Sequence, residues 1–283
     1  MENFYRRIDH RVKNRRESTV RISAFENPYI KRCSPCIPSM TYALGMRCTD
    51  GVILITDRKL TLLSGSQPEY IDKIQGDIPG VLWTSAGAVG EFEIFRREIK
   101  DFVQIKNLRN EIITIDGFIK KLSQTTYEIF EKYRYNYGGF EILVGISGKT
   151  YGTGKSWIGH ISADGLVEQV NKYMAIGTGA PYGSIYLQEI WRQTEGAITM
   201  EEAAHLGYLI IKYIQRFQLD DAVGVGEEHN FKHPQIKFIP DNEEDYGPND
   251  KVLDDISKRV NAKTIIIQKH IANDCKLLSG SDS

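Results

Sequence analysis

Apolar and polar residues follow two different periods along the chain, and the change from one to the other separates strands from helices. Short apolar runs bounded by turn residues predict strands. A first group of strands is predicted at Thr41–Cys48, Val52–Asp57, Asp72–Gln75 and Val81–Ser85. A second group is predicted at Glu141–Ser147, Ser156–Ser162, Leu166–Gln169 and Tyr173–Ile176, followed by a last strand at Gln235–Ile239.

Apolar residues at helical spacing fill the intervals between these strands. Four helices are predicted, at about Gly90–Lys106, Asp116–Tyr135, Pro181–Arg192 and Thr199–Leu219. Thr199 is placed to cap the last of them, because acidic residues follow it in the first turn. Strands and helices are grouped rather than alternating, and this order predicts an α+β fold with sheets packed face to face between helical layers.

The two ends of the chain differ in charge from its middle. Residues 1–39 hold nine Lys and Arg against four acidic residues, whereas residues 241–283 hold six against nine. We therefore expect a basic N-terminal extension or propeptide at 1–40, a folded domain at 41–240 and a charged C-terminal tail at 241–283. Within this tail, Thr264–Ile267 is apolar enough to add a strand.

Composition narrows the function classes. The chain has 36 Lys and Arg against 37 Asp and Glu, so its net charge of −1 indicates neither nucleic acid nor a membrane surface as partner. Its four cysteines are too few for a disulfide framework. It lacks an apolar leader and an apolar run of the roughly 18 residues that span a membrane. A cytoplasmic protein is expected.

Two motifs that could hold a cofactor do not meet its requirements. Gly148–Ser156 is rich in glycine, but its spacing departs from that of a phosphate loop and it joins two strands instead of opening a helix. A structural zinc site needs four ligands. Cys33 and Cys36 could form one only together with His229 and His233, which lie in a distant part of the chain. Surface positions are the simpler interpretation, and no metal or organic cofactor is expected.

The residues with the strongest chemical pattern stand at the ends of predicted strands. Thr41 begins the first strand, Asp57 ends the second, and Lys73 lies in the third. Hairpin connections would bring their hydroxyl, carboxylate and ammonium groups to one sheet edge. A nearby ammonium favours an alkoxide, so the three could form an activated nucleophile. The alternative is a surface ion pair beside a threonine.

The run TYALGMRCTDGVILITDRKLT, residues 41–61, resembles the start of proteasome β subunits, which are N-terminal-nucleophile hydrolases. Thr41, Asp57 and Lys73 match that family's catalytic threonine, aspartate and lysine. The resemblance continues at residues 85–90, 175–179 and 220–226 and covers the chain from about Thr41 to Ile239. It implies a four-layer αββα sandwich, with two antiparallel sheets between helical layers. Proteasome α subunits share this sandwich. The pattern Tyr…Phe-Ser-Pro-Asp-Gly…Glu-Tyr-Ala that is typical of their N-terminal segment is missing from residues 1–40.

The resemblance also implies an activity and a set of site residues. It implies a threonine-type endopeptidase that hydrolyses unfolded proteins or peptides and assembles with other α- and β-type subunits in stacked rings. Gly87 would donate an N–H to the oxyanion, while Thr178 and Asp220 would hold Thr41 and its amine. An apolar substrate pocket would be lined by Leu60, Ile71, Ser85 and Val89.

Three residues depart from the family pattern: Thr178 and Val223 replace serines, and Met40 stands where self-processing members have glycine. The activity needs Thr41 as the N-terminus, and the bulk of Met40 should obstruct self-cleavage. Met40 could instead initiate translation and be removed. If residues 1–39 are retained, the chain would be a silent structural subunit. An amidase or acyl-transferase of the same superfamily is a further alternative.

Overall fold

Two antiparallel sheets form the centre of the folded part of the chain that the structure describes. The structure is a computed structural model that describes residues 41–60, 69–87, 89–109, 111–133, 140–193, 197–216, 219–220, 223–226, 232–242 and 244–261. The first sheet has the order β10 (Tyr173–Ile176), β1 (Ala43–Arg47), β2 (Gly51–Thr56) and β11 (Gln235–Pro240). The second has the order β5 (Gln75–Ile78), β6 (Val81–Gly87), β7 (Phe140–Ile146), β8 (Trp157–Ile161) and β9 (Val167–Gln169).

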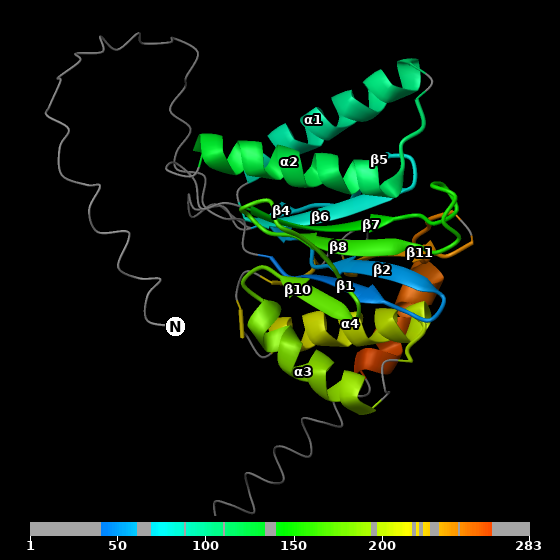
Figure 1. The fold of residues 1–283 in the computed structure, drawn as a ribbon. Helices are drawn as coiled ribbons and strands as arrows, with labels where there is room; N and C mark the ends of the chain where they lie inside the picture. The colour runs from blue at the N-terminus through cyan, green and yellow to red at the C-terminus, as the bar shows by residue number, and fades with distance from the viewer. Residues whose placement is uncertain are drawn as a thin grey trace, which may run out of the picture. The chain divides into compact units, whose positions relative to one another are not determined.

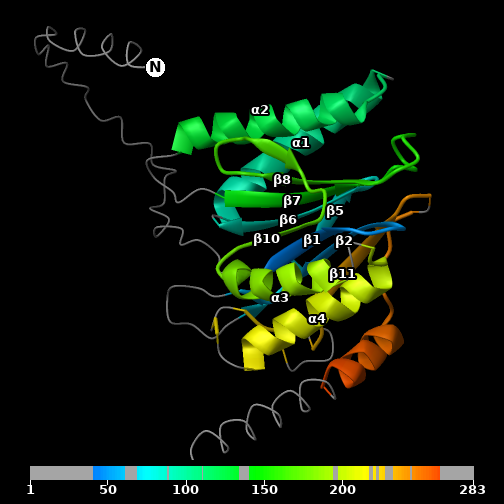
Figure 2. The ribbon, with the colours of Figure 1, turned by 60° about the horizontal axis from the view of Figure 1, so that its bottom comes forward.

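Helices cover the outer face of each sheet (Figures 1 and 2). The helices are α1 (Val89–Leu108) and α2 (Ile115–Tyr133) on the second sheet, and α3 (Ala180–Gln193) and α4 (Met200–Arg216) on the first. A third apolar cluster, with Leu54, Leu82 and Leu143, lies between the two sheets. These layers form the αββα sandwich, and the predicted fold class is confirmed.

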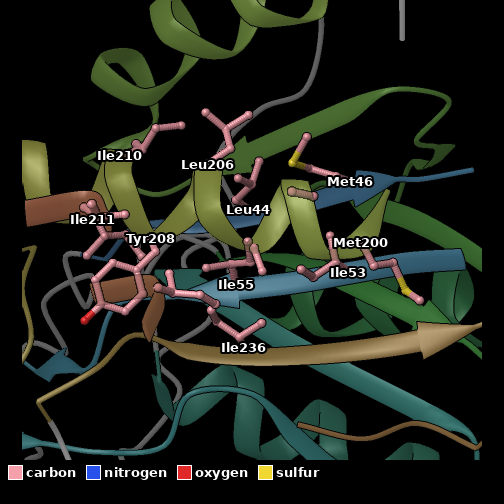
Figure 3. Packing of buried hydrophobic residues seen from close by; sticks show 14 of the residues in the cluster. Leu44, Met46, Ile53, Ile55, Met200, Leu206, Tyr208, Ile210, Ile211 and Ile236 are labelled. Atoms are coloured by element: carbon pink, nitrogen blue, oxygen red, sulfur yellow. The ribbon is translucent and has the colours of Figure 1, made fainter. Parts of the chain in front are cut away.

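Strand β2 shows how the sequence specifies these layers. Its residues alternate between two cores, because successive side chains of a strand point to opposite faces. Ile53 and Ile55 pack against α4, whereas Val52 and Leu54 pack between the sheets. Figure 3 shows this α4 packing, with Leu206 and neighbouring residues above the strand. Since both faces are covered, the strand is an uninterrupted apolar run and all six of its residues are buried.

A helix over residues 250–261 was missed by the sequence analysis, which expected a charged tail there. Leu253, Ile256 and Val260 point from it into the same core as α4. Their spacing of three and four residues is the helical signal, but acidic and basic residues surround it. The first part of the expected tail is therefore built into the core. Thr264–Ile267 and the extension at residues 1–40 lie outside the described residues.

Replacing Ile256 by alanine should destabilise the protein by about 2–5 kcal/mol, because the side chain is 1% exposed and its loss leaves a cavity. Val252 on the same helix is 41% exposed, so Val252→Ala should change the stability by less than about 0.5 kcal/mol. Urea unfolding of both variants measures the difference. Equal effects would show that this helix is not packed as described.

Element boundaries agree with the sequence predictions within a few residues, with one correction that concerns the candidate site. The strand expected at Asp72–Gln75 is found as β5 (Gln75–Ile78), so Lys73 precedes the strand. Two short strands, β3 (Lys59–Leu60) and β4 (Glu69–Tyr70), also pair with each other. Among the described helices, none is both long and apolar enough to cross a bilayer.

Candidate active site

The structure brings Thr41, Asp57 and Lys73 into direct contact. Thr41 lies two residues before β1, and Asp57 directly follows its hairpin partner β2. Thr41 Oγ1 donates a hydrogen bond of 2.7 Å to Asp57 Oδ1. Lys73 Nζ donates to Thr41 Oγ1 at 2.5 Å and to Asp57 Oδ1 at 2.7 Å. Asp57 and Thr41 are fully buried and Lys73 is 9% exposed, so the alternative of a surface ion pair is wrong.

The backbone around Asp57 holds its carboxylate in place. The amide of Tyr42 donates to Oδ1 at 3.0 Å. The amides of Lys59 and Gly224 donate to Oδ2 at 3.2 Å and 3.3 Å. Three backbone donors and one ammonium are a sufficient set of partners for a fully buried carboxylate. They also fix where its oxygen meets the Thr41 hydroxyl.

Burial and charge act in opposite directions on the Lys73 ammonium. Burial lowers the pKa of Lys73 below its ordinary value. The negative charge of Asp57 and its hydrogen bond oppose this shift, and so does the more distant charge of Asp220. A desolvated ammonium stabilises a neighbouring oxyanion more strongly than a solvated one, because less water screens it. The arrangement is therefore suited to lowering the pKa of an adjacent hydroxyl.

The turn between β10 and α3 closes over the backbone of Thr41. Gly177 has φ of +89°, and a Cβ there would meet the Thr41 carbonyl, so only glycine fits. The amide of Gly179 donates to that carbonyl at 3.3 Å. The Thr178 side chain, which lies between them, is exposed, and none of the described hydrogen bonds joins it to Thr41. The turn positions Thr41 through its glycines.

The remaining residues implied by the resemblance come from other parts of the chain, and their roles stay predictions. Gly87 ends β6 with φ of +110°, a conformation that favours glycine. Asp220 is half-buried, and its charge reaches Lys73. Val223, at a serine position of the family, is instead buried in the core next to Gly179. Its side chain makes an apolar contact there.

The predicted substrate pocket is only partly described. Leu60 in β3 and Ser85 in β6 are half-buried, and Ile71 is 37% exposed. The Val89 side chain lies outside the described residues. An apolar pocket formed by these four residues stays a prediction.

Sequence reasoning missed Gln235, which begins β11 and for which the sequence pattern predicts only the start of a strand. Its Oε1 accepts hydrogen bonds from the amides of Lys73 and Ile74, both at 2.7 Å. Its Nε2 donates to the Ile74 carbonyl at 2.9 Å. The side chain is 7% exposed. One amide group therefore holds the backbone from which the Lys73 side chain extends.

A second missed group surrounds His233, which the sequence suggested lies at the surface. The side chain is 5% exposed; the Tyr208 hydroxyl contacts its Nδ1 at 2.7 Å, and its Nε2 contacts Asp254 at 3.1 Å. Its carbonyl accepts a 2.7 Å hydrogen bond from Arg58, which also pairs with Asp72. Within the described ranges, no three His, Cys, Asp or Glu side chains are grouped as metal ligands. His229, Cys33 and Cys36 fall outside those ranges.

Protonation of His233 should destabilise the fold. Burial lowers the pKa of His233, and the charges of Lys232 and Lys212 act in the same direction, while Asp254 opposes them. The unfolded chain binds this proton near pH 6.5. The stability that the neutral His233 side chain contributes is therefore fully present above about pH 6.5. It is lost as the pH falls below that value.

Urea unfolding between pH 7 and pH 5 measures this loss. His233→Asn should show a smaller decline in stability than the wild type over that range. A decline equal to that of the wild type in His233→Asn would contradict the assignment to His233.

Comparisons with known proteins identify the family that the chain matches. The family model described as "Proteasome subunit" matches residues 40–223. A proteasome subunit beta of Ferroglobus placidus is 25% identical over 186 residues, which is 66% of this chain and 83% of that protein. A proteasome subunit beta of Methanosarcina barkeri is 26% identical over 156 residues, covering 54% of this chain and 69% of that protein.

A solved structure supports the fold independently of sequence. A mutant of Anbu from Hyphomicrobium sp. strain MC1 aligns with a TM-score of 0.61. The alignment covers 82% of this chain and 96% of that one, at 16% sequence identity. Such a low identity supports a shared architecture and carries no residue role.

Proposed function

Because this chain belongs to the proteasome subunit family, we propose that it is a threonine-type endopeptidase subunit that hydrolyses peptide bonds with Thr41 as its N-terminal nucleophile. The observation that carries the proposal is the buried contact of one hydroxyl with both an ammonium and a carboxylate. A threonine placed only for folding would not need a desolvated ion pair on its oxygen, because such a pair is costly to bury.

In the proposed reaction, Thr41 Oγ attacks the scissile carbonyl carbon and gives its proton to the free α-amine of the same residue, directly or through water. An α-amine has an ordinary pKa of about 8, which suits a general base near neutral pH. The C–N bond then breaks, the leaving amine takes the proton, and an ester to Thr41 remains. Water hydrolyses this ester and releases the second product.

The other groups stabilise charge or hold position in this scheme. Lys73 lowers the pKa of the Thr41 hydroxyl, and Asp57 fixes Lys73. The Gly87 amide would donate to the oxyanion, an interaction worth about 3 kcal/mol where one such donor has been removed from a protease. Thr178 and Asp220 would act on the α-amine. No metal or organic cofactor enters any step.

The proposed activity requires removal of residues 1–40, because the nitrogen of an internal Thr41 is an amide and cannot act as a base. A start at Met40 followed by removal of that methionine would supply the free amine. Residues 1–39 would then be an extension that the active form does not carry. We further propose that the subunit assembles with other α- and β-type subunits in stacked rings in the cytoplasm and degrades unfolded proteins or peptides.

Fluorogenic peptides with an apolar residue before the scissile bond test the proposal. Protein purified from its native host should hydrolyse them, and a threonine-directed peptide epoxyketone should abolish the activity. Absence of hydrolysis by a protein that begins at Thr41 would overturn the proposal and leave a structural subunit. Hydrolysis of small amides alone would indicate an amidase of the same superfamily.

A further inference from the structure

The side chain of Gln235 is in hydrogen-bonded contact with the segment that carries Lys73, although 162 residues separate the two in the chain. Each polar atom of its amide group has a partner on that segment. Oε1 accepts from the amides of Lys73 and Ile74, and Nε2 donates to the carbonyl of Ile74. This segment precedes β5 and has no regular secondary structure. The ladder of β3 and β4 is extended by a hydrogen bond from the Ile71 amide to the Arg58 carbonyl and ends two residues before Lys73, so it does not include Lys73 itself.

The register of the first sheet adds a second constraint. Gln235 in β11 lies directly opposite Thr56 in β2, and Thr56 lies directly opposite Ala43 in β1. Asp57 follows Thr56 in the chain, and Thr41 lies two residues before Ala43. The rigid ladder that carries Thr41 and Asp57 therefore also carries the Gln235 side chain.

Lys73 belongs to the connection toward the other sheet. The residue after it, Ile74, is 4% exposed and packs in the core between the sheets. Lys73 must therefore reach the Thr41 hydroxyl from an irregular segment that crosses between the two layers. A misplacement of about 1 Å in such a catalytic contact can lower a rate about 100-fold. The three Gln235 hydrogen bonds are the described contacts that join this segment to the β11 edge of the first sheet.

We propose that Gln235 is a positioning residue, which fixes the Lys73 ammonium against Thr41 and Asp57 and so sets the reactivity of the Thr41 hydroxyl. The inference rests on the proposed function, in which Thr41 is the nucleophile. Gln235 touches neither Thr41 nor substrate in this role. It acts through the backbone of Lys73 and Ile74.

Two substitutions separate positioning from folding. Gln235→Leu removes all three hydrogen bonds at nearly the same volume. It should lower kcat about 10- to 100-fold per active site and leave KM within about twofold. Gln235→Glu keeps an acceptor for the two amides and adds a negative charge near Lys73. It should retain more of kcat than Gln235→Leu and move the alkaline limb of the pH profile upward, because a nearby anion raises the pKa of an ammonium.

The matched control is Gln75, a half-buried glutamine on β5 whose Oε1 has no hydrogen-bond partner among the described residues. Gln75→Leu should leave kcat within about twofold. Active sites are counted by titration with the peptide epoxyketone, so that a loss of folded enzyme is not mistaken for a lower kcat. Wild-type kcat and an unchanged pH profile in Gln235→Leu would overturn the inference. The inference would also be overturned if both Gln235 variants lost active sites equally and the remaining active sites had wild-type kcat.

A readout that needs no activity keeps this inference separate from the proposed function. In protein labelled with 13C-lysine, the Lys73 Cε resonance is assigned by its loss in Lys73→Ala and is followed against pH. Gln235→Leu should change the pKa of Lys73, whereas Gln75→Leu should not. Wild-type protein without Thr41-dependent hydrolysis would defeat the proposed function alone. An unchanged Lys73 titration in Gln235→Leu would defeat the positioning role alone.

Discussion

Thr41→Ala should reduce peptide hydrolysis to background while the protein stays folded. Loss of the nucleophile in a well-studied serine protease lowers kcat by about a million-fold, and the same scale is expected here. The variant removes one hydroxyl and one methyl group, and the Lys73–Asp57 ion pair of 2.7 Å remains. Fluorogenic peptide turnover measures the loss, and circular dichroism verifies the fold.

Thr41→Ser is the matched variant, since it keeps the hydroxyl that contacts Asp57 and Lys73. It should retain a measurable share of the activity and remain sensitive to the epoxyketone. Full activity in Thr41→Ala would place the chemistry at another residue. Equal and complete loss in both variants would indicate that the site also requires the methyl group of Thr41.

Lys73→Ala should lower kcat about 1,000-fold, equivalent to about 4 kcal/mol of transition-state stabilisation, because the only described ammonium on the Thr41 oxygen is removed. Lys73→Arg should lose peptide hydrolysis as well. Its guanidinium keeps the charge but is larger and planar, and the buried site is filled around an ammonium. Steady-state kinetics on both variants, per folded enzyme, provide the measurement.

Removing Lys73 also leaves the buried Asp57 carboxylate without its cation, and this costs stability. Three backbone amides still donate to Asp57, so we expect a folded protein with a lower melting temperature. Asp57→Asn, which keeps the shape and removes the charge, should also lose activity. An active Lys73→Ala enzyme would contradict the proposed mechanism.

The sheet that carries Thr41 and Asp57 could be predicted from local sequence. The turn at Thr49-Asp50-Gly51 separates two apolar runs, and this pattern is typical of an antiparallel hairpin. The hairpin register then brings the start of β1 and the end of β2 to the same edge. The roles of Gly87, Thr178 and Asp220 came from the family resemblance and stay predictions.

Features that depend on tertiary contacts were mislocated or missed. The third strand was expected too early because Gly76 and Asp77 read as a turn, whereas the turn lies at Pro79 and Gly80, where Gly80 has φ of +71°. The helix at 250–261 presents a narrow apolar stripe within a charged segment. The apolar residues that cover this stripe come from the same core cluster as α4, far away in the sequence. Gln235 carries no local signal, because its partners lie 161 and 162 residues away.

Covalent labelling shows whether Thr41 becomes a free N-terminal nucleophile. Protein from the native host is treated with a peptide epoxyketone, which reacts with a hydroxyl and the adjacent free amine, and is then analysed by intact mass and N-terminal peptide mapping. The expected product is a chain that begins at Thr41 and carries one inhibitor equivalent on that residue. A dominant chain that begins at Met1 and carries no label would contradict it.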